Sequence, residues 1–169
     1  MTVETCIDPA EFRRTLGHFC TGIAVITGCP GGEPVGFTVQ SLVSLSLDPP
    51  LVGFSPAKSS GSWRRIRETG RFCVNILTDE QERLCMAFAK GDGDRFAGVA
   101  TGRCRGGLPV LSGSLAFVSC TIDGEHETGD HTFVVGRVQE LSVLRTDARP
   151  LLFFRGSVGD PPPRVAAVA

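Results

Sequence analysis

Glycine and proline divide this sequence into many short segments, and this punctuation is the feature that most limits its fold. The chain of 169 residues contains 21 Gly and 11 Pro. Several segments between them are rich in Val, Ile, Phe and Thr, such as residues 22–29 (GIAVITGC) and 71–77 (RFCVNIL). Short β-rich segments separated by turn residues are typical of antiparallel barrels and sandwiches. The sequence therefore predicts a mainly β protein.

A few short helices are expected among the strands. Asp8 precedes Pro9, which is typical of a helix start, and two further helices are expected over residues 63–68 and 80–88. Strands are expected at residues 22–29, 34–40, 43–47, 51–54, 71–77, 114–122, 132–143 and 151–155. Within residues 43–47 apolar side chains alternate with Ser, which predicts a half-buried strand. About seven strands with two or three inserted helices indicate an antiparallel barrel.

The length of the chain predicts a single domain, because single domains cluster at ~100–150 residues. We place this domain at residues 1–156. Residues 157–169 contain three consecutive prolines followed by small apolar residues. We expect this last stretch to be a flexible C-terminal tail.

Charge and hydropathy exclude several classes of partner. The 17 basic and 18 acidic residues give a net charge of −1, without the basic excess typical of nucleic-acid-binding proteins. No run of about eighteen predominantly apolar residues is present, so we expect no membrane span. The first residues include Glu4 and no basic region ahead of an apolar stretch. We therefore expect no secretory signal and a cytoplasmic protein.

The seven cysteines do not follow a metal-binding pattern. They lie at positions 6, 20, 29, 73, 85, 104 and 120, without a CxxC pair or zinc-ligand spacing. Most of them lie inside apolar runs. We therefore expect free, largely buried thiols and no metal site.

Residues 36–50 (GFTVQSLVSLSLDPP) contain a dense row of hydroxyl and amide side chains between two apolar strands. Two interpretations are open. Ser alternating with Leu can form a solvated edge strand. The same row can present hydroxyls and backbone N–H groups to a flat polar heterocycle.

This segment resembles the signature of the short-chain NAD(P)H:flavin reductases, in which a Thr-x-x-Ser run precedes a Ser-x-Ser-Leu-Asp-Pro-Pro-Leu block. Similar motifs occur in the same order along nearly the whole chain, at residues 12–22, 59–63, 70–77, 94–96, 129–131 and 150–156. The resemblance implies an FMN-binding split β-barrel, a Greek-key-like antiparallel barrel with a few short helices. It also implies a homodimer with flavin sites at or near the subunit interface.

The family resemblance implies the reductase component of a two-component flavin-dependent monooxygenase. Such an enzyme transfers a hydride from NADH, or alternatively NADPH, to FAD or FMN. The reduced flavin then diffuses to a separate oxygenase that hydroxylates a phenol, a steroid ring or a natural product. Three other functions stay open: a protein that binds flavin tightly and acts directly on its own substrate, a non-catalytic flavin or haem module, and an interaction protein.

The resemblance and the chemistry of the residues together give the candidate flavin site. An isoalloxazine ring needs an apolar floor and donors that stabilise its anionic reduced form. The candidate ring contacts are Thr38, Val39, Gln40, Ser41 and Leu42. The candidate phosphate contacts are Ser55, Lys58, Ser59 and Ser60, with Lys90 and Arg95 as secondary candidates. Simple helix capping is the alternative role for the segment 55–60.

His131 is the candidate catalytic residue. In the resemblance, the motif of Gly129, Asp130 and His131 borders the open flavin face where the nicotinamide stacks. His131 would orient the nicotinamide or stabilise charge. The alternative is a histidine bonded to the loop backbone. A second histidine, His126, lies in the expected polar loop 123–130 and is expected to face solvent.

Overall fold

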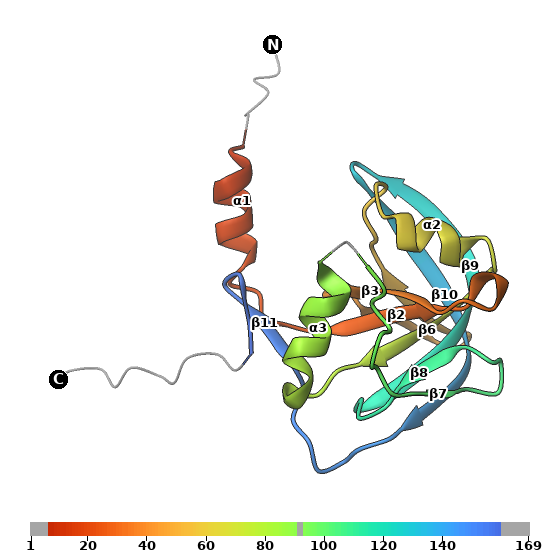
Figure 1. Ribbon diagram of the computed structural model, residues 1–169. Coiled ribbons are helices and arrows are strands. Elements are labelled where there is room, and N and C mark those ends of the chain that lie inside the picture. The colour runs from red at the N-terminus through yellow and green to blue at the C-terminus, as the bar shows by residue number, and fades with distance from the viewer. Residues whose placement is uncertain (1–6, 91–92, 160–169) are drawn as a thin grey trace.

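The protein is built around one large antiparallel sheet, as the computed structural model of residues 7–90 and 93–159 shows (Figure 1). The strand order in this sheet is β3-β2-β6-β9-β10-β5-β4. Its strands are β2 (Ala24–Gly28), β3 (Val35–Val39), β4 (Val43–Leu47), β5 (Pro50–Phe54), β6 (Arg71–Ile76), β9 (Ala116–Thr128) and β10 (His131–Val143). Two small sheets consist of β1 (Thr21–Gly22), β11 (Leu152–Phe154) and β12 (Ser157–Val158), and of β7 (Thr101–Arg103) and β8 (Pro109–Leu111). The mainly β, antiparallel prediction is confirmed.

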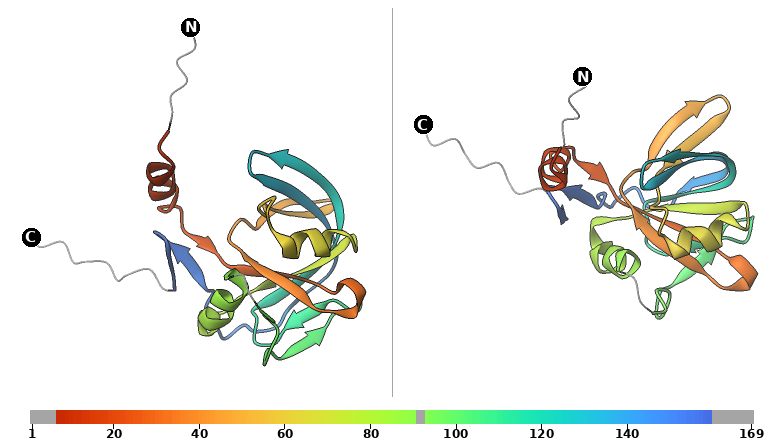
Figure 2. Two further views of the ribbon diagram at one scale, coloured as in Figure 1. Left: turned by 45° about the horizontal axis from the view of Figure 1, so that its top comes forward. Right: turned by 90° about the horizontal axis from the view of Figure 1, so that it is seen from above.

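The helices are short, and a polar capping residue precedes two of them. They are α1 (Pro9–Leu16), α2 (Gly61–Arg67) and α3 (Glu82–Ala89), with 3-10 turns at Pro30–Gly32 and Asp79–Gln81. The side chain of Asp8 accepts a hydrogen bond from the N–H of Ala10 (3.1 Å), and that of Ser60 accepts one from Trp63 (3.2 Å). Each therefore satisfies an N–H group that has no partner within the helix. α2 and α3 pack on the large sheet. In contrast, α1 lies beside the small sheet of β1, β11 and β12 and away from the large one (Figure 2).

The large sheet curls around a cluster of aromatic side chains. Phe54 is fully buried, and the centre of its ring lies 5.2 Å from that of Trp63 and 5.1 Å from that of Phe72. The ring of Phe37 lies 6.3 Å from that of Phe54, although β3 and β5 are far apart in the strand order. The curl therefore brings the two ends of the sheet to a shared core.

The predicted barrel is not closed by hydrogen bonds in the described part of the chain. β3 and β4 are the two edges of the sheet and do not pair with each other. The chain leaves the strand conformation between Val39 and Val43, so no ladder joins these edges. The large sheet is therefore a curled antiparallel sheet. Side chains and short loops, and not strand pairing, connect its two edges.

The structure corrects the prediction that residues 43–47 are half-buried. Val43, Leu45 and Leu47 are 44%, 42% and 91% exposed. β4 is an edge strand that pairs only with β5, so the rest of the chain covers little of it. Alternation indicated the strand correctly but could not indicate what lies against its faces.

Three other differences concern the C-terminal half. β9 continues to Thr128, so the expected loop 123–130 is a strand followed by a tight turn. The hairpin of β7 and β8 was not predicted, because its strands have three residues each. β12 pairs with β11 within the stretch expected as a tail, and residues 160–169 lie outside the described part of the chain.

The cysteine prediction is largely confirmed. Cys73, Cys85, Cys104 and Cys120 are free and buried, whereas Cys20 is free and exposed. Burial raises the pKa of Cys120 to about 12, and it also raises the pKa of Cys73. The thiols of Cys73 and Cys120 therefore stay protonated at neutral pH. Cys6 lies outside the described residues.

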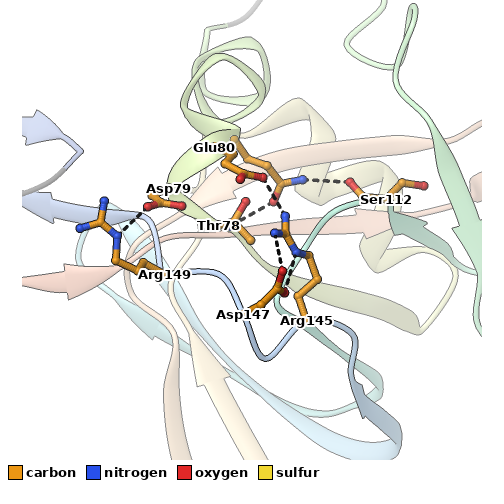
Figure 3. Close-up of polar contacts among 8 residues, drawn as sticks. Thr78, Asp79, Glu80, Ser112, Arg145, Asp147 and Arg149 are labelled. Carbon is orange, nitrogen blue, oxygen red and sulfur yellow. Dashed lines mark hydrogen bonds and ion pairs between the residues drawn. The ribbon is translucent and has the colours of Figure 1, made fainter.

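An ion-pair network holds the start of α3 against the chain that follows β10 (Figure 3). Arg145 contacts Glu80 at 2.7 Å and Asp147 at 3.2 Å, and Arg149 contacts Asp79 at 2.9 Å. The hydrogen bond from Arg145 lowers the pKa of Asp147. Asp79 and Glu80 lie in the 3-10 turn before α3. The network therefore fixes where this helix enters the fold.

Gly136 provides a test of the curled sheet. It is buried in β10, and a Cβ atom there would lie 2.4 Å from Cζ of Phe72. Gly136→Ala should lower the free energy of unfolding by about 1–3 kcal/mol, because Phe72 has no free space into which to move. Urea unfolding followed by circular dichroism measures this change.

The matched control is Gly102→Ala in β7, where a Cβ atom would meet nothing within 4 Å. Its unfolding free energy should stay within ~0.5 kcal/mol of the wild type. Equal effects of the two substitutions would contradict the packing argument.

Candidate functional site

A cleft of about 560 Å³ opens at the end of β3. We call it the main cleft. It is lined by Phe37, Thr38, Val39, Gln40, Ser41, Ser55, Pro56, Ala57, Ser59, Ser60, Gly61, Phe88, Ala89, Arg95 and His131. These residues come from β3 and the segment after it, the segment from β5 to the start of α2, the end of α3 and the segment that follows it, and the start of β10. The volume is in the ~300–1,000 Å³ range of small-molecule sites.

Two hydroxyl groups join the walls of the main cleft. The hydroxyl of Thr38 donates to the carbonyl of Cys85 (2.7 Å) and connects β3 to α3. The N–H of Ser55 donates to the hydroxyl of Ser41 (2.9 Å), which connects the ends of β3 and β5. The Ser41 hydroxyl also lies 3.5 Å from the Ser55 carbonyl. The Thr38 proton is thus directed to the protein, and toward a ligand this hydroxyl acts as an acceptor.

Backbone hydrogen bonds place the start of β10 at the main cleft. The N–H of Lys58 donates to the carbonyl of Asp130 (3.0 Å), and that of Thr132 donates to Pro56 (3.0 Å). Gly129 has φ +62°, which a tight hairpin turn requires and which glycine adopts without strain. The candidate phosphate segment and the candidate nicotinamide motif therefore lie side by side.

His131 lines the main cleft with its side chain 44% exposed. Its Nδ1 lies 2.7 Å from the Asp130 carboxylate. The hydrogen bond from His131 lowers the pKa of Asp130, so this carboxylate stays ionised in moderate acid. The bond restricts how the imidazole ring is oriented.

Arg95 supplies positive charge to the main cleft. Its Nη1 donates to the carbonyl of Gly36 (2.8 Å) and to the hydroxyl of Ser62 (3.0 Å). These bonds hold the guanidinium between β3 and α2. An arginine fixed in this way is well suited to a phosphate group.

The structure brings together nine of the predicted site residues: Thr38, Val39, Gln40, Ser41, Ser55, Ser59, Ser60, Arg95 and His131. The remaining ones do not line the main cleft. Leu42 packs against the aromatic core, and Gly129 and Asp130 form the turn that precedes His131. The ammonium of Lys58 contacts Glu127 at 3.3 Å in a separate depression, and Lys90 is an exposed residue that follows α3.

Sequence reasoning missed part of the apolar lining. Phe37 and Phe88 are 8% and 0% exposed overall, and both border the main cleft. Pro56, Ala57 and Gly61 also contribute to it. Phe88 could be found only as a core residue of α3, because the pattern that indicates burial does not show which buried residues meet a cavity.

The arrangement fits a flavin. Apolar groups from Phe37, Phe88 and Ala89 lie beside hydroxyls and backbone groups at the end of β3. β3 is an edge strand that pairs only with β2, so it has N–H and C=O groups on its other side. This combination matches a ring with an apolar face and a polar rim.

The described residues contain neither a metal-binding cluster nor a membrane-spanning helix. No group of three or more His, Cys, Asp or Glu side chains there is arranged to hold a metal ion. None of the helices in residues 7–90 and 93–159 is long and apolar enough to cross a membrane.

Comparison with known proteins gives a consistent result. The sequence model of the flavin reductase like domain matches residues 16–161. The reductase subunit HsaB of a flavin-dependent monooxygenase from Rhodococcus jostii (strain RHA1) is 49% identical over 150 residues, 89% of this chain and 76% of that protein. An NADH-dependent flavin reductase from a Rhodococcus species is 37% identical over 89% of this chain and 85% of its own length.

The fold comparison agrees with the sequences. The crystal structure of a nitrilotriacetate monooxygenase component B homologue from Mycobacterium thermoresistibile superposes with a TM-score of 0.86. It is 45% identical, and the match covers 95% of this chain and 90% of that one. The chain therefore belongs to the flavin reductase-like domain family.

Proposed function

We propose that this protein reduces FAD or FMN with NADH and releases the reduced flavin to a separate monooxygenase. The observation that carries the proposal is the main cleft, in which nine of the predicted flavin and nicotinamide contacts meet. The similarity to reductase subunits of monooxygenases supports the same reaction. A flavin that is passed to another enzyme must dissociate in each cycle, so we expect weak binding.

The residues of the main cleft have separate roles in this proposal. A flavin held in the main cleft would supply the acceptor for the hydride of the nicotinamide. Backbone groups of Val39 and Gln40 orient the rim of the ring and stabilise negative charge on it. The hydroxyl of Thr38 acts as an acceptor, because its proton is already donated to Cys85, whereas the hydroxyl of Ser41 accepts from the N–H of Ser55 and can donate to the ring.

Arg95 takes the place of Lys58 as the main phosphate contact in this proposal. The sequence favoured Lys58, but its ammonium contacts Glu127 outside the main cleft. Arg95 lines the main cleft together with Ser59 and Ser60. A guanidinium and two hydroxyls are sufficient donors for a phosphate group.

NADH oxidation with added flavin tests the reaction. Loss of NADH absorbance should be slow without flavin and much faster with FAD or FMN, because the flavin is the electron acceptor. No stimulation by either flavin would contradict the proposed function. A protein that is purified yellow and needs no added flavin would instead indicate a tight flavoprotein.

His131→Ala tests the nicotinamide side of the main cleft. Loss of this positioning contact should raise the KM for NADH or slow flavin reduction about tenfold to a hundredfold, or ~1.4–2.7 kcal/mol. The flavin Kd should change little. Stopped-flow reduction of bound flavin separates the two effects.

His126→Ala is the matched control for this experiment. His126 is exposed in β9 and does not line the main cleft. Its replacement should leave the reduction rate unchanged. Wild-type rates and NADH dependence in His131→Ala would assign His131 a structural role only.

We also propose a homodimer, because α1 has no buried residue in the single chain. Phe12, Leu16 and Phe19 are 54%, 57% and 76% exposed. An isolated helix of this length is not stable in water, and a second copy can cover its apolar face. The exposed Leu47 of β4 adds to the apolar surface available for contact.

Sedimentation equilibrium tests the dimer. The wild type should have twice the mass of the chain, and Leu16→Asp should shift it toward the monomer, because a charge at this position opposes burial. Thr15→Asp changes a neighbouring exposed residue of α1 and should leave the dimer intact. A wild-type protein that is monomeric at micromolar concentration would contradict the proposal.

A further inference from the structure

The two ring nitrogens of His131 have different surroundings. His131 lines the main cleft, and its Nδ1 lies 2.7 Å from the carboxylate of Asp130. The side chain of Asp130 is 94% exposed and does not line the cleft. Nδ1 is therefore engaged outside the cleft. In the part of the chain that the structure describes, Nε2 has no hydrogen-bond partner.

Backbone contacts hold this pair in place although it lies at the surface. The N–H of Lys58 donates to the carbonyl of Asp130 (3.0 Å), and the hydroxyl of Thr128 donates to the carbonyl of His131 (3.3 Å). Ala57 and His131 also form an isolated antiparallel bridge. The segment before α2 and the turn between β9 and β10 thus keep the carboxylate and the ring adjacent, and their arrangement does not depend on burial.

The carboxylate decides which nitrogen of His131 carries the proton. The hydrogen bond from His131 lowers the pKa of Asp130, so this carboxylate is ionised at neutral pH and can only accept hydrogen bonds. The proton of the bond therefore belongs to Nδ1. In the neutral ring, Nε2 then carries no proton and is a hydrogen-bond acceptor.

An acceptor at this position matches one particular group of the nicotinamide. The ring of NADH carries a carboxamide, whose NH2 group donates hydrogen bonds and whose oxygen accepts them. Nε2 of the neutral imidazole pairs with the NH2 group and not with the oxygen. A neutral imidazole also brings no charge to the cleft. Of the two roles expected for His131, orientation of the nicotinamide is therefore favoured over stabilisation of charge.

We propose that Asp130 is a positioning residue that keeps the proton of His131 on Nδ1, so that Nε2 accepts a hydrogen bond from the carboxamide of the nicotinamide. This inference rests on the proposed function, because it takes the nicotinamide to lie beside His131. It makes the NH2 group of the carboxamide a determinant of coenzyme recognition. It assigns no proton transfer to His131.

Nitrogen-15 NMR of the protein without flavin or NADH tests the role of Asp130. At about pH 9, above the ordinary titration range of histidine, the chemical shifts of the ring nitrogens report the tautomer. Wild-type His131 should have a protonated Nδ1 and an unprotonated Nε2. Asp130→Ala should shift the ring toward the other tautomer, because the acceptor for Nδ1–H is lost. His131→Ala assigns the signals, and the spectra show that each variant is folded.

The same spectra contain two controls. Nδ1 of His18 lies 2.9 Å from a backbone carbonyl of α1, so its signals should be the same in the wild type and in Asp130→Ala. Glu127→Ala is the matched control variant, because it removes an exposed carboxylate of β9 that pairs with a lysine and not with His131. It should leave the tautomer of His131 unchanged.

Kinetics with a coenzyme analogue test the hydrogen bond to the carboxamide. Reduced 3-acetylpyridine adenine dinucleotide keeps the carbonyl group but has no NH2 group, so it leaves the Nε2 acceptor unpaired. The ratio of kcat/KM for NADH to that for the analogue should fall roughly three- to tenfold in His131→Ala, the range for one hydrogen bond. Asp130→Ala should lower this ratio too, and Glu127→Ala should not. Comparing ratios between variants cancels the intrinsic difference in reducing power between the two coenzymes.

Each outcome decides the proposal. A wild-type His131 with its proton on Nε2, or an equal change of tautomer in Glu127→Ala, would overturn the role of Asp130. An unchanged ratio in His131→Ala would overturn the carboxamide contact and leave flavin reduction intact. A ratio that falls in His131→Ala but not in Asp130→Ala would show that His131 acts without Asp130, and this would also overturn the proposal.

Failure of the proposed function gives a different result. Wild-type protein that oxidises neither coenzyme with FAD or FMN would overturn the proposed function and the carboxamide contact together. The NMR spectra would still decide whether Asp130 sets the tautomer of His131, because they are recorded without flavin and without NADH.

Discussion

The curl of the large sheet around Phe54 is the constraint on which the rest of the structure depends. Phe54 contacts Trp63 of α2 and Phe72 of β6, and Phe37 of β3 lies against the same ring cluster. Burying this cluster requires the ends of the sheet to approach each other, since large aromatic side chains contribute most of the apolar area of a small core. The polar segments that follow β3 and β5 therefore meet, and the main cleft forms between them.

Hydrogen bonds then set the shape of the cleft within this frame. Ser41 connects the ends of β3 and β5, and Thr38 connects β3 to α3. The ion pairs of Arg145 and Arg149 fix the start of α3 from its other side. A site whose walls are joined in this way keeps its geometry when a ligand enters and leaves.

The charged residues divide into those that serve the main cleft and those that serve the surface. Arg95 is held by Gly36 and Ser62 and lines the main cleft. Lys58 and Arg67 pair with glutamates of β9 and stiffen the hairpin beside the main cleft. Ion pairs at such exposed positions contribute little stability, so their main effect is on position.

The sequence by itself determined the local structure and the family. The positions of Asp8, Ser60 and the β-rich segments predicted most helices and strands, because capping and strand propensity act over a few residues. The motif around Thr38 and Ser41 indicated the candidate flavin segment, because a motif is a local pattern that the sequence shows directly. The sequence did not show how far β9 extends: the strand continues to Thr128, and a tight turn at Gly129 precedes His131.

Only the tertiary structure decided which of these residues meet. It directed Lys58 to Glu127 and Arg95 to the main cleft, although both were candidates for the same phosphate. It also exposed Leu47 on an edge strand and placed Phe88 beside the cleft. These outcomes depend on contacts between segments far apart in the chain, and periodicity and composition carry no information about such contacts.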